Sequence, residues 1–192
     1  MRISGGIAKG RRTSTKRLIT KISSGERLRP TSSKVREALF DILRDNIEGA
    51  RFVDLYAGTG TVGFEALSRG ADSAVFVEPE ELRYRVIKSS ALELGFEDKT
   101  QVVKKDAHKF LQEAIADRQN YDIFFVDPPY KSDEIEKVLP IIGESKLLRD
   151  GGIVIVEHFS KKRAPESAGN LRTAKIYRYG DTMLTLYRKV EI

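Results

Sequence analysis

The sequence has no cysteine and only two histidines among its 192 residues. Without cysteine the chain has no disulfide scaffold, no thiolate metal site and no cysteine nucleophile. His108 and His158 lie far apart in the sequence, which argues against a histidine-based metal site. We therefore expect no bound metal.

Long apolar runs are also missing. The first residues, Met1-Arg2-Ile3-Ser4-Gly5-Gly6, do not resemble the apolar core of a secretory signal. No stretch approaches the roughly 18 apolar residues that a membrane span needs. We expect a cytoplasmic protein with no membrane contact, and a monomer built on one core.

The positive charge of the chain is concentrated at its start. The formal net charge is +6, but residues 1–30 hold nine basic side chains and one acid, a net charge of +8. From residue 31 onward the net charge is −2. Clustered Lys and Arg release counterions from nucleic-acid phosphates, so residues 1–30 are predicted to be a basic arm that binds a polyanion. A solvated polar tail is the alternative.

Residues 31–192 are predicted to form the main domain. The arm is expected to form a short hairpin or to become ordered only on its partner. It is expected to end at Arg29-Pro30, because proline disfavours helical geometry in the residue before it. A helix is then expected over about 33–45, with Thr31, Ser32 or Ser33 as its N-cap.

From residue 51 onward, strand and helix patterns alternate. The predicted strands are mostly continuous apolar runs, typical of a parallel sheet covered on both faces. They span 52–56, 74–78, 101–104, 123–127 and 153–157, with helices over about 62–70, 80–94, 107–117 and 133–145. Pro140 should kink or shorten the last helix. Gly180-Asp181 joins two further strands, 175–179 and 182–188, as a hairpin. The pattern predicts a doubly wound α/β fold.

A glycine-rich loop follows the first predicted strand. Gly58, Gly60 and Gly63 match the G-x-G-x-x-G pattern, and Glu78 ends the next predicted strand. Glycines allow a ligand close to the backbone, and a carboxylate at that position can accept hydrogen bonds from ribose hydroxyls. A purely structural turn is the alternative.

The acidic residues near this loop indicate which kind of nucleotide ligand the loop could bind. Asp54 lies shortly before Gly58, where it would repel a pyrophosphate but could face a cationic amino-acid group. This arrangement resembles motif I of the class I methyltransferases, which bind S-adenosylmethionine. Asp106 resembles the acid that accepts from the adenine amine in that family, and it is equally well placed as a helix N-cap.

The fourth predicted strand ends in Asp127-Pro128-Pro129-Tyr130. Prolines can simply stop a strand, but an acid, two prolines and an aromatic residue coincide here. They resemble the [D/N]-P-P-[Y/F] signature of amino-group N-methyltransferases. The Asp127 carboxylate and the Pro128 carbonyl can orient an amine, and Tyr130 can stack on a base.

Over nearly its whole length the chain resembles the RsmD-type 16S rRNA guanine-N2 methyltransferases of bacteria. The resemblance is carried by the segments Arg2–Gly6, Gly10–Arg12, Leu28–Thr31, Val35–Phe40, Asp54–Gly60, Gly63–Gly70, Val126–Tyr130 and Tyr179–Thr182. It implies a Rossmann-like sheet of about seven strands, mostly parallel with an antiparallel C-terminal hairpin.

The resemblance also implies the substrates and the site. The methyl donor would be S-adenosylmethionine, and the acceptor a guanine of 16S rRNA, within an assembled small-subunit particle. The residues implied to bind the cofactor are Asp54, Ala57, Gly58, Gly60, Glu78, Asp106 and Ala107. Those implied to bind and activate the guanine are Asp127, Pro128, Pro129 and Tyr130. RNA contacts are expected from Arg11, Arg12, Arg29 and Arg36.

Two other interpretations of the motifs remain open. The same signature serves amino methyltransferases acting on DNA adenine or protein glutamine, and a non-catalytic RNA-binding module or a nicotinamide-dependent oxidoreductase would have a similar fold. Two features receive no catalytic role. His158 is expected in a loop or at a rim, and Lys161-Lys162-Arg163 is expected to be a solvated loop or an extension of the RNA-binding surface.

Overall fold

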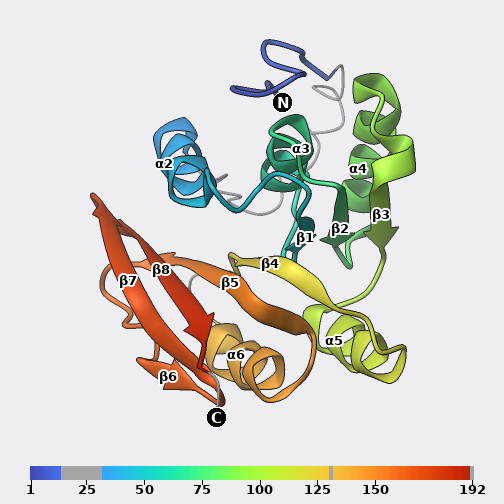
Figure 1. Cartoon of the computed structure of the whole chain (residues 1–192). Helices are drawn as coiled ribbons and strands as arrows, with labels where there is room; N and C mark the ends of the chain where they lie inside the picture. Colours follow the sequence, from blue (N-terminus) through green and yellow to red (C-terminus); the bar gives the residue numbers. More distant parts are fainter. Residues whose placement is uncertain (14–31, 130–131, 191–192) are drawn as a thin grey trace. The chain divides into compact units, whose positions relative to one another are not determined.

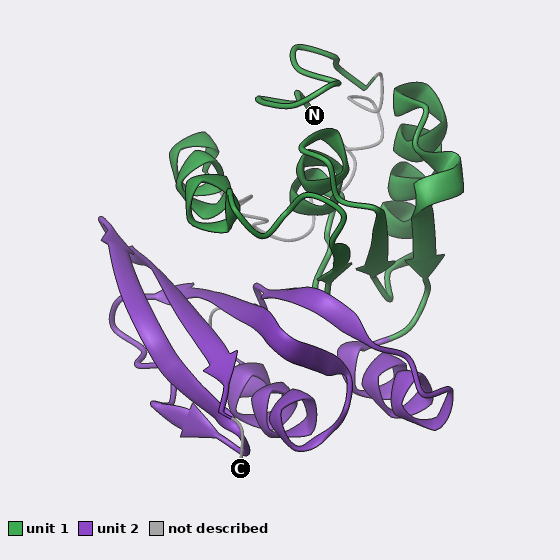
Figure 2. Cartoon of the chain, viewed as in Figure 1, with its two compact units in different colours: residues 1–105 green, residues 106–192 purple. Residues whose placement is uncertain are grey.

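The computed structural model describes residues 1–13, 32–129 and 132–190 (Figure 1). The chain divides into two compact units, residues 1–105 and 106–192 (Figure 2). The predicted boundary between a basic arm and the main domain, near residue 30, lies outside the described residues.

The first unit contains three parallel strands in the order β3-β2-β1. Helix α3 packs against β1 and β2, and α4 packs against β3. The elements are α2 (Ser33–Leu43), β1 (Arg51–Asp54), α3 (Thr61–Ser68), β2 (Ser73–Val77), α4 (Glu81–Leu94), a 3-10 helix (Glu97–Lys99) and β3 (Thr100–Val103). The strand–helix alternation predicted from the sequence is confirmed.

Local sequence signals explain where these helices begin and end. The Ser32 hydroxyl accepts from the Val35 amide at 3.2 Å and caps α2, as one of the three predicted N-caps. Gly95 ends α4 with a φ of 72°, a left-handed conformation that favours glycine. The interior includes a pair of packed aromatic rings, Phe64 and Phe76, whose centroids are 4.7 Å apart.

Residues 1–13 form a small hairpin that belongs to the first unit. An antiparallel bridge joins Arg2 to Arg12, and Ile3 and Ala8 are buried. The Ile7 amide donates to the carbonyl of Ser68, at the end of α3. The start of the arm therefore forms a hairpin, which was one of the two expectations for it.

The second unit orders its strands β4-β5-β8-β7-β6. Strands β4 and β5 are parallel, whereas β5, β8, β7 and β6 pair antiparallel. The elements are α5 (Ala107–Ala116), β4 (Tyr121–Val126), α6 (Glu134–Glu144), β5 (Leu148–Phe159), β6 (Ser167–Ala168), β7 (Leu171–Tyr179) and β8 (Thr182–Lys189). Gly180-Asp181 joins β7 to β8, and Tyr179 pairs with Thr182, so the predicted C-terminal hairpin is confirmed.

The start predicted for one strand of this unit was wrong, and so was the shortening predicted for one helix. Strand β5 begins at Leu148 rather than 153, because the polar, glycine-containing segment before Ile153 joins the sheet through a register shift opposite β4. Pro140 does not shorten α6, which runs from Glu134 to Glu144 with the proline inside it, and a kink at Pro140 stays a prediction. The described residues form eight strands, where about seven were expected, and the two-residue β6 is the shortest.

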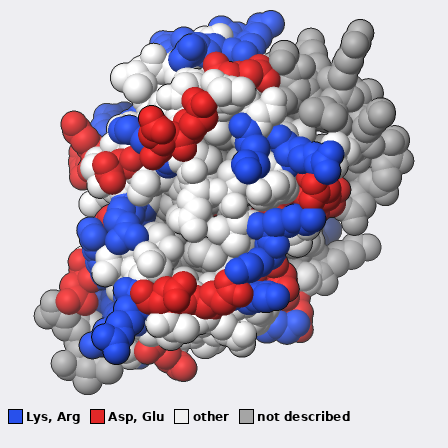
Figure 3. Space-filling view, turned by 90° about the vertical axis from the view of Figure 1, so that its right-hand side faces the viewer, with Lys and Arg blue, Asp and Glu red and all other residues white. Residues whose placement is uncertain are grey.

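Charges of both signs mix on the face shown in Figure 3, where Lys and Arg lie beside Asp and Glu. In the first unit, for example, Glu81 forms ion pairs with both Arg85 and Lys104. This mixture agrees with the nearly balanced charge of the sequence after residue 30. Among the described residues, no helix combines the length and apolar character needed to cross a membrane.

Candidate active site

The glycine-rich loop connects β1 to α3, as predicted. Gly58 and Gly60 have φ angles of 55° and 79°, which favour glycine at both positions. A Cβ atom on Gly58 would have no neighbour within 4 Å, so this stretch of backbone is open to a ligand. Gly63 has a different role, because a Cβ atom there would lie 2.3 Å from the Phe76 ring. Its small size permits close packing of helix and sheet.

Two buried carboxylates hold this loop. Asp54, at the end of β1, accepts a hydrogen bond from the Gly63 amide at 3.1 Å. Glu78, directly after β2, accepts from the Gly58 amide at 3.0 Å and from the Glu80 amide at 2.9 Å. Asp54 is 2 % exposed and Glu78 is 3 % exposed. The structure thus brings together the predicted residues Asp54, Gly58 and Glu78. Ala57 is fixed nearby, because its amide donates a hydrogen bond to the Val77 carbonyl.

The environment of these acids favours a cationic ligand. Burial raises the pKa of Asp54 to about 7. The hydrogen bond from Gly63 acts to lower this pKa, and the negative charge of Glu78 acts to raise it further. Burial also raises the pKa of Glu78, against the hydrogen bond from Glu80 and the nearby Arg83 guanidinium. A positive group bound here would stabilise both carboxylates, whereas a pyrophosphate would be repelled.

Asp54 should make the stability of the ligand-free protein depend on pH. Folding raises the pKa of Asp54 from 3.8 to about 7, so the folded protein binds this proton more tightly than the unfolded chain does. The bound proton therefore contributes to the free energy of unfolding. This contribution is complete below pH 3.8 and is lost as pH rises through 7. Asp54→Asn should remove this contribution, which is on the order of 4 kcal/mol. Urea denaturation of both proteins between pH 4 and 8 measures it. A constant difference in unfolding free energy over that range would contradict the raised pKa.

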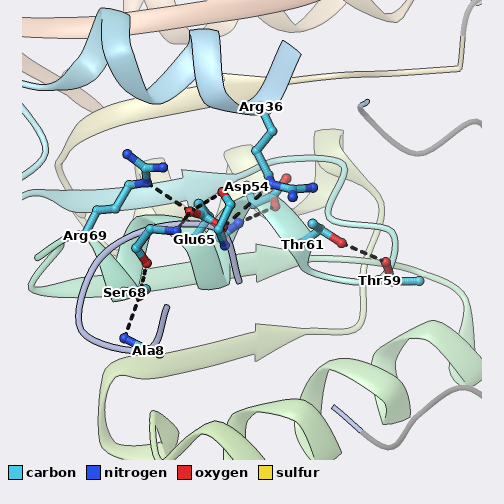
Figure 4. Close-up of polar contacts among 11 residues, drawn as sticks. Ala8, Arg36, Asp54, Thr59, Thr61, Glu65, Ser68 and Arg69 are labelled. Atoms are coloured by element: carbon cyan, nitrogen blue, oxygen red, sulfur yellow. Dashed lines mark hydrogen bonds and ion pairs between the residues drawn. The ribbon is translucent and has the colours of Figure 1, made fainter. Parts of the chain in front are cut away.

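Glu65, which sequence reasoning missed, joins the N-terminal hairpin to α3 (Figure 4). Its fully buried carboxylate accepts from the Ser4 amide (2.9 Å), the Ser4 hydroxyl (2.8 Å) and the Gly5 amide (2.7 Å). It also accepts from Arg69 Nε at 3.0 Å and lies 3.7 Å from Arg36 Nε. One feature of the sequence could have identified Glu65: it is the one charged residue in the otherwise uncharged sequence of α3.

The remaining predicted cofactor residues, Asp106 and Ala107, begin the second unit. The Asp106 carboxylate accepts from the Lys109 amide at 2.8 Å and caps α5, which confirms the N-cap interpretation. Ala107 is buried in the first turn of that helix. A contact between Asp106 and an adenine amine stays a prediction.

The proline motif follows β4 directly. Asp127 is half-buried, Pro128 is buried and Pro129 is exposed, while Tyr130 lies outside the described residues. The carbonyl of Pro129 accepts from both the amide and the hydroxyl of Ser132, at 2.9 and 2.7 Å. These two bonds engage the Pro129 carbonyl, and the role of the Asp127 carboxylate and the Pro128 carbonyl toward a substrate amine stays a prediction.

The arginines expected to contact RNA differ in their surroundings. Arg11 and Arg12 are exposed, and Arg11 donates to the Leu94 carbonyl at 2.9 Å. The Arg36 side chain is only 11 % exposed and lies beside Glu65, so its charge is balanced inside the first unit. Arg29 lies outside the described residues.

His158 was wrongly expected in a loop or at a rim. It belongs to β5, is 6 % exposed and has hydrogen-bonding partners at both ring nitrogens. The apolar run that marked this strand ends before His158, so its sequence pattern did not include the histidine. Within the described parts of the chain, no cluster of three or more His, Cys, Asp or Glu residues is arranged to hold a metal ion.

Comparisons with known proteins cover almost the whole chain. The family described as Conserved hypothetical protein 95 matches residues 1–188. The YlbH protein of Bacillus subtilis is 33 % identical over 189 residues, covering 98 % of this chain and 99 % of the relative. The ribosomal RNA small subunit methyltransferase D of Escherichia coli strain K12 is 30 % identical over 191 residues, covering 98 % and 90 %.

Solved structures give the same result for the fold. The yhhF protein from Escherichia coli superposes with a TM-score of 0.81 at 28 % identity, covering 100 % of this chain and 99 % of that one. An RNA methyltransferase from Salinibacter ruber, in complex with S-adenosyl-L-homocysteine, has a TM-score of 0.66 at 17 % identity, covering 85 % and 95 %. The predicted class I methyltransferase fold is therefore confirmed, and the chain belongs to the family described as Conserved hypothetical protein 95, which includes the small subunit methyltransferase D proteins.

Proposed function

We propose that this protein transfers a methyl group from S-adenosylmethionine to the exocyclic N2 amine of a guanine in 16S rRNA. The observation that carries the proposal is the Asp127-Pro128-Pro129 segment directly after β4, in a chain whose relatives are named small subunit methyltransferases. We further propose an assembled small-subunit particle as the substrate, a cytoplasmic location and a monomeric enzyme.

The buried acids support S-adenosylmethionine as the donor. This cofactor supplies a methyl group on a cationic sulfonium and carries an amino-acid group with an ammonium. Asp54 and Glu78 provide negative charge beside the open backbone of Gly58. Glu78 can accept from the ribose hydroxyls, and the Asp54 charge can attract the cationic end of the donor. The same two acids oppose a nicotinamide dinucleotide, because its pyrophosphate is negative.

The residues after β4 account for activation of the amine. The lone pair of an exocyclic base amine is delocalised into the ring, which makes the amine a poor nucleophile. Hydrogen bonds from the amine to the Asp127 carboxylate and the Pro128 carbonyl would orient it and favour a more tetrahedral nitrogen. Tyr130, the next residue after Pro129, would stack on the base and contribute about 1–3 kcal/mol. Most of the acceleration then comes from positioning and electrostatics.

The product identifies the reaction. The purified protein is incubated with S-adenosylmethionine and small-subunit particles or naked 16S rRNA, and the nucleosides are separated by mass spectrometry. We expect N2-methylguanosine, formed faster on the particle. DNA and glutamine-containing protein substrates are tested in parallel. Methylation of adenine or glutamine without methylguanosine would overturn the assigned substrate, and binding of NAD without S-adenosylmethionine would overturn the methyltransferase assignment.

The exposed arginines of the hairpin should contribute to RNA binding through phosphate contacts. Arg11→Gln and Arg12→Gln should each lower the magnitude of the salt slope, the change of log affinity with log salt concentration, by about 0.7–0.9 for each phosphate that is no longer neutralised. Filter binding at several salt concentrations measures this slope. Arg36→Gln tests another of the predicted contacts, and its effect on the slope should be smaller because Arg36 is paired with Glu65. An unchanged slope in the Arg11 and Arg12 variants would exclude phosphate contacts by these residues.

A further inference from the structure

Lys162 connects the end of β5 to the segment that follows the proline motif. It lies in a turn closed by a hydrogen bond from its amide to the Phe159 carbonyl, at 2.9 Å. Its Nζ donates to the Ser132 carbonyl at 2.5 Å and lies 3.3 Å from the Glu136 carboxylate on α6. Lys162 therefore bridges two segments that are far apart in the sequence.

Ser132 relays this contact to the motif. The same residue whose carbonyl accepts from Lys162 donates its amide and hydroxyl to the Pro129 carbonyl. Through these two hydrogen bonds Ser132 restrains the Pro129 carbonyl. Because Pro128 and Asp127 immediately precede Pro129, this contact also restrains the two acceptors assigned to the substrate amine.

The turn that carries Lys162 is itself anchored in the sheet. His158 Nδ1 lies 2.7 Å from the Lys162 carbonyl, and Nε2 lies 2.8 Å from the Thr185 hydroxyl on β8. A carbonyl oxygen only accepts hydrogen bonds, so Nδ1 carries a proton and donates to Lys162. Both His158 and Thr185 are buried, which gives the turn a fixed support.

A cavity lies between these groups. Its lining includes Pro128, Pro129, Ser132, His158, Phe159 and Lys162. The two prolines of the motif therefore share one cavity with the lysine and with the histidine that anchors it.

We propose that Lys162 is a positioning residue for methyl transfer, which holds the Asp127-Pro128-Pro129 segment in its reactive geometry through Ser132. This inference rests on the proposed function, because it assigns the amine to the Asp127 and Pro128 acceptors. The competing role for Lys162 is a direct phosphate contact as part of the basic run 161–163. Lys161 serves as the matched control, since it is exposed and its Nζ lies 5.8 Å from the Phe159 ring centroid.

Steady-state kinetics on small-subunit particles distinguish the two roles. Lys162→Met keeps most of the apolar stem and removes the donor. It should lower kcat by about 10- to 100-fold, since small displacements of a reacting geometry have effects of this size. The KM for the particle and the Kd for S-adenosylmethionine should stay within twofold of the wild type. Lys162→Arg should recover much of kcat, and Lys161→Met should keep it.

Hydrogen exchange at the Ser132 amide, measured without cofactor or RNA, gives a second readout. Lys162→Met should accelerate exchange at this amide, and Lys161→Met should not. Glu136→Gln removes the ionic partner but leaves the bond from Lys162 to Ser132, so its effect should be smaller. If Lys162→Met does not fold, Lys162→Gln replaces it in both measurements.

Two results would overturn the positioning role. One is a rate of hydrogen exchange at the Ser132 amide that is the same in Lys162→Met as in the wild type. The other is an equal rise of KM in the Lys161 and Lys162 variants with kcat unchanged and a lower salt slope, which indicates phosphate contact. If the wild-type protein methylates no RNA, the proposed function fails, but the exchange measurement still tests whether Lys162 restrains Ser132.

Discussion

Asp127→Ala should lower kcat for methyl transfer by about 10²- to 10³-fold, the effect expected when one preorganised polar group at a reacting centre is removed. The reason is that the amine loses the carboxylate that orients its lone pair. Binding of S-adenosylmethionine should be retained, because Asp54, Gly58 and Glu78, the residues assigned to the cofactor in the first unit, are unchanged. Single-turnover methylation and calorimetric titration with the cofactor measure the two effects separately.

Two further variants control for charge and shape. Asp127→Asn keeps an oxygen acceptor, and asparagine occurs in the signature that this motif resembles, so we expect a smaller loss than with alanine. Asp122→Ala removes a carboxylate from the same strand, where Asp122 pairs with Arg149 at 3.1 Å, and should keep near-normal turnover. Normal turnover in Asp127→Ala would refute the catalytic role of Asp127.

The parts of the fold that the sequence predicts are those in which local and tertiary preferences agree. The apolar run before Asp127 is a buried strand, and Gly95 ends its helix where the pattern places it. The loop with Gly58 and Gly60, and Glu78 beside it, could also be predicted, because a ligand site of this kind requires a fixed order of residue types along one chain segment.

Contacts between distant polar residues were not predictable from a local pattern. The bond from Lys162 to Ser132 depends on how the turn after β5 is placed, and the charge run around Lys162 is equally typical of a solvated loop. His158 illustrates the same limit, because hydrogen bonds to Lys162 and Thr185 make burial of its ring acceptable. Pro140 lies inside α6, so the tertiary structure overrides the tendency of proline to interrupt a helix.

The N-terminal segment shows how composition and structure can differ. Its excess of basic residues predicted a polyanion-binding arm, yet its described part, the hairpin, also includes a buried Ile3 and a set of backbone donors directed at Glu65. A Cβ atom on Gly6 would lie 1.7 Å from the Ser68 carbonyl oxygen, so the glycines of this segment permit close approach to α3. Deleting the arm would therefore remove part of the first unit, and single arginine substitutions are the cleaner test of RNA binding.

Glu65→Ala should destabilise the protein by about 3–5 kcal/mol, the usual effect of breaking a buried ionic cluster by removing one member. The substitution would leave two amides, at Ser4 and Gly5, without their acceptor. It would also leave Arg36 and Arg69 without the carboxylate that balances them. Urea denaturation followed by circular dichroism measures the loss in unfolding free energy.

Glu65→Gln separates charge from hydrogen bonding, because it keeps one acceptor oxygen and should cost less than alanine. Glu37→Ala removes an exposed glutamate from α2 of the same unit and should change the unfolding free energy by less than about 0.5 kcal/mol. Amide exchange at Ser4 and Gly5 shows where the Glu65 variants respond. Faster exchange at these amides, together with a global loss of stability, means that docking of the hairpin is coupled to folding of the unit. Unchanged stability in Glu65→Ala would mean that the free-energy cost of burying this carboxylate equals the gain from its hydrogen bonds and ion pairs. The hairpin would then be held by burial of Ile3 and Ala8 and by the hydrogen bonds from the Ile7 and Ala8 amides to Ser68.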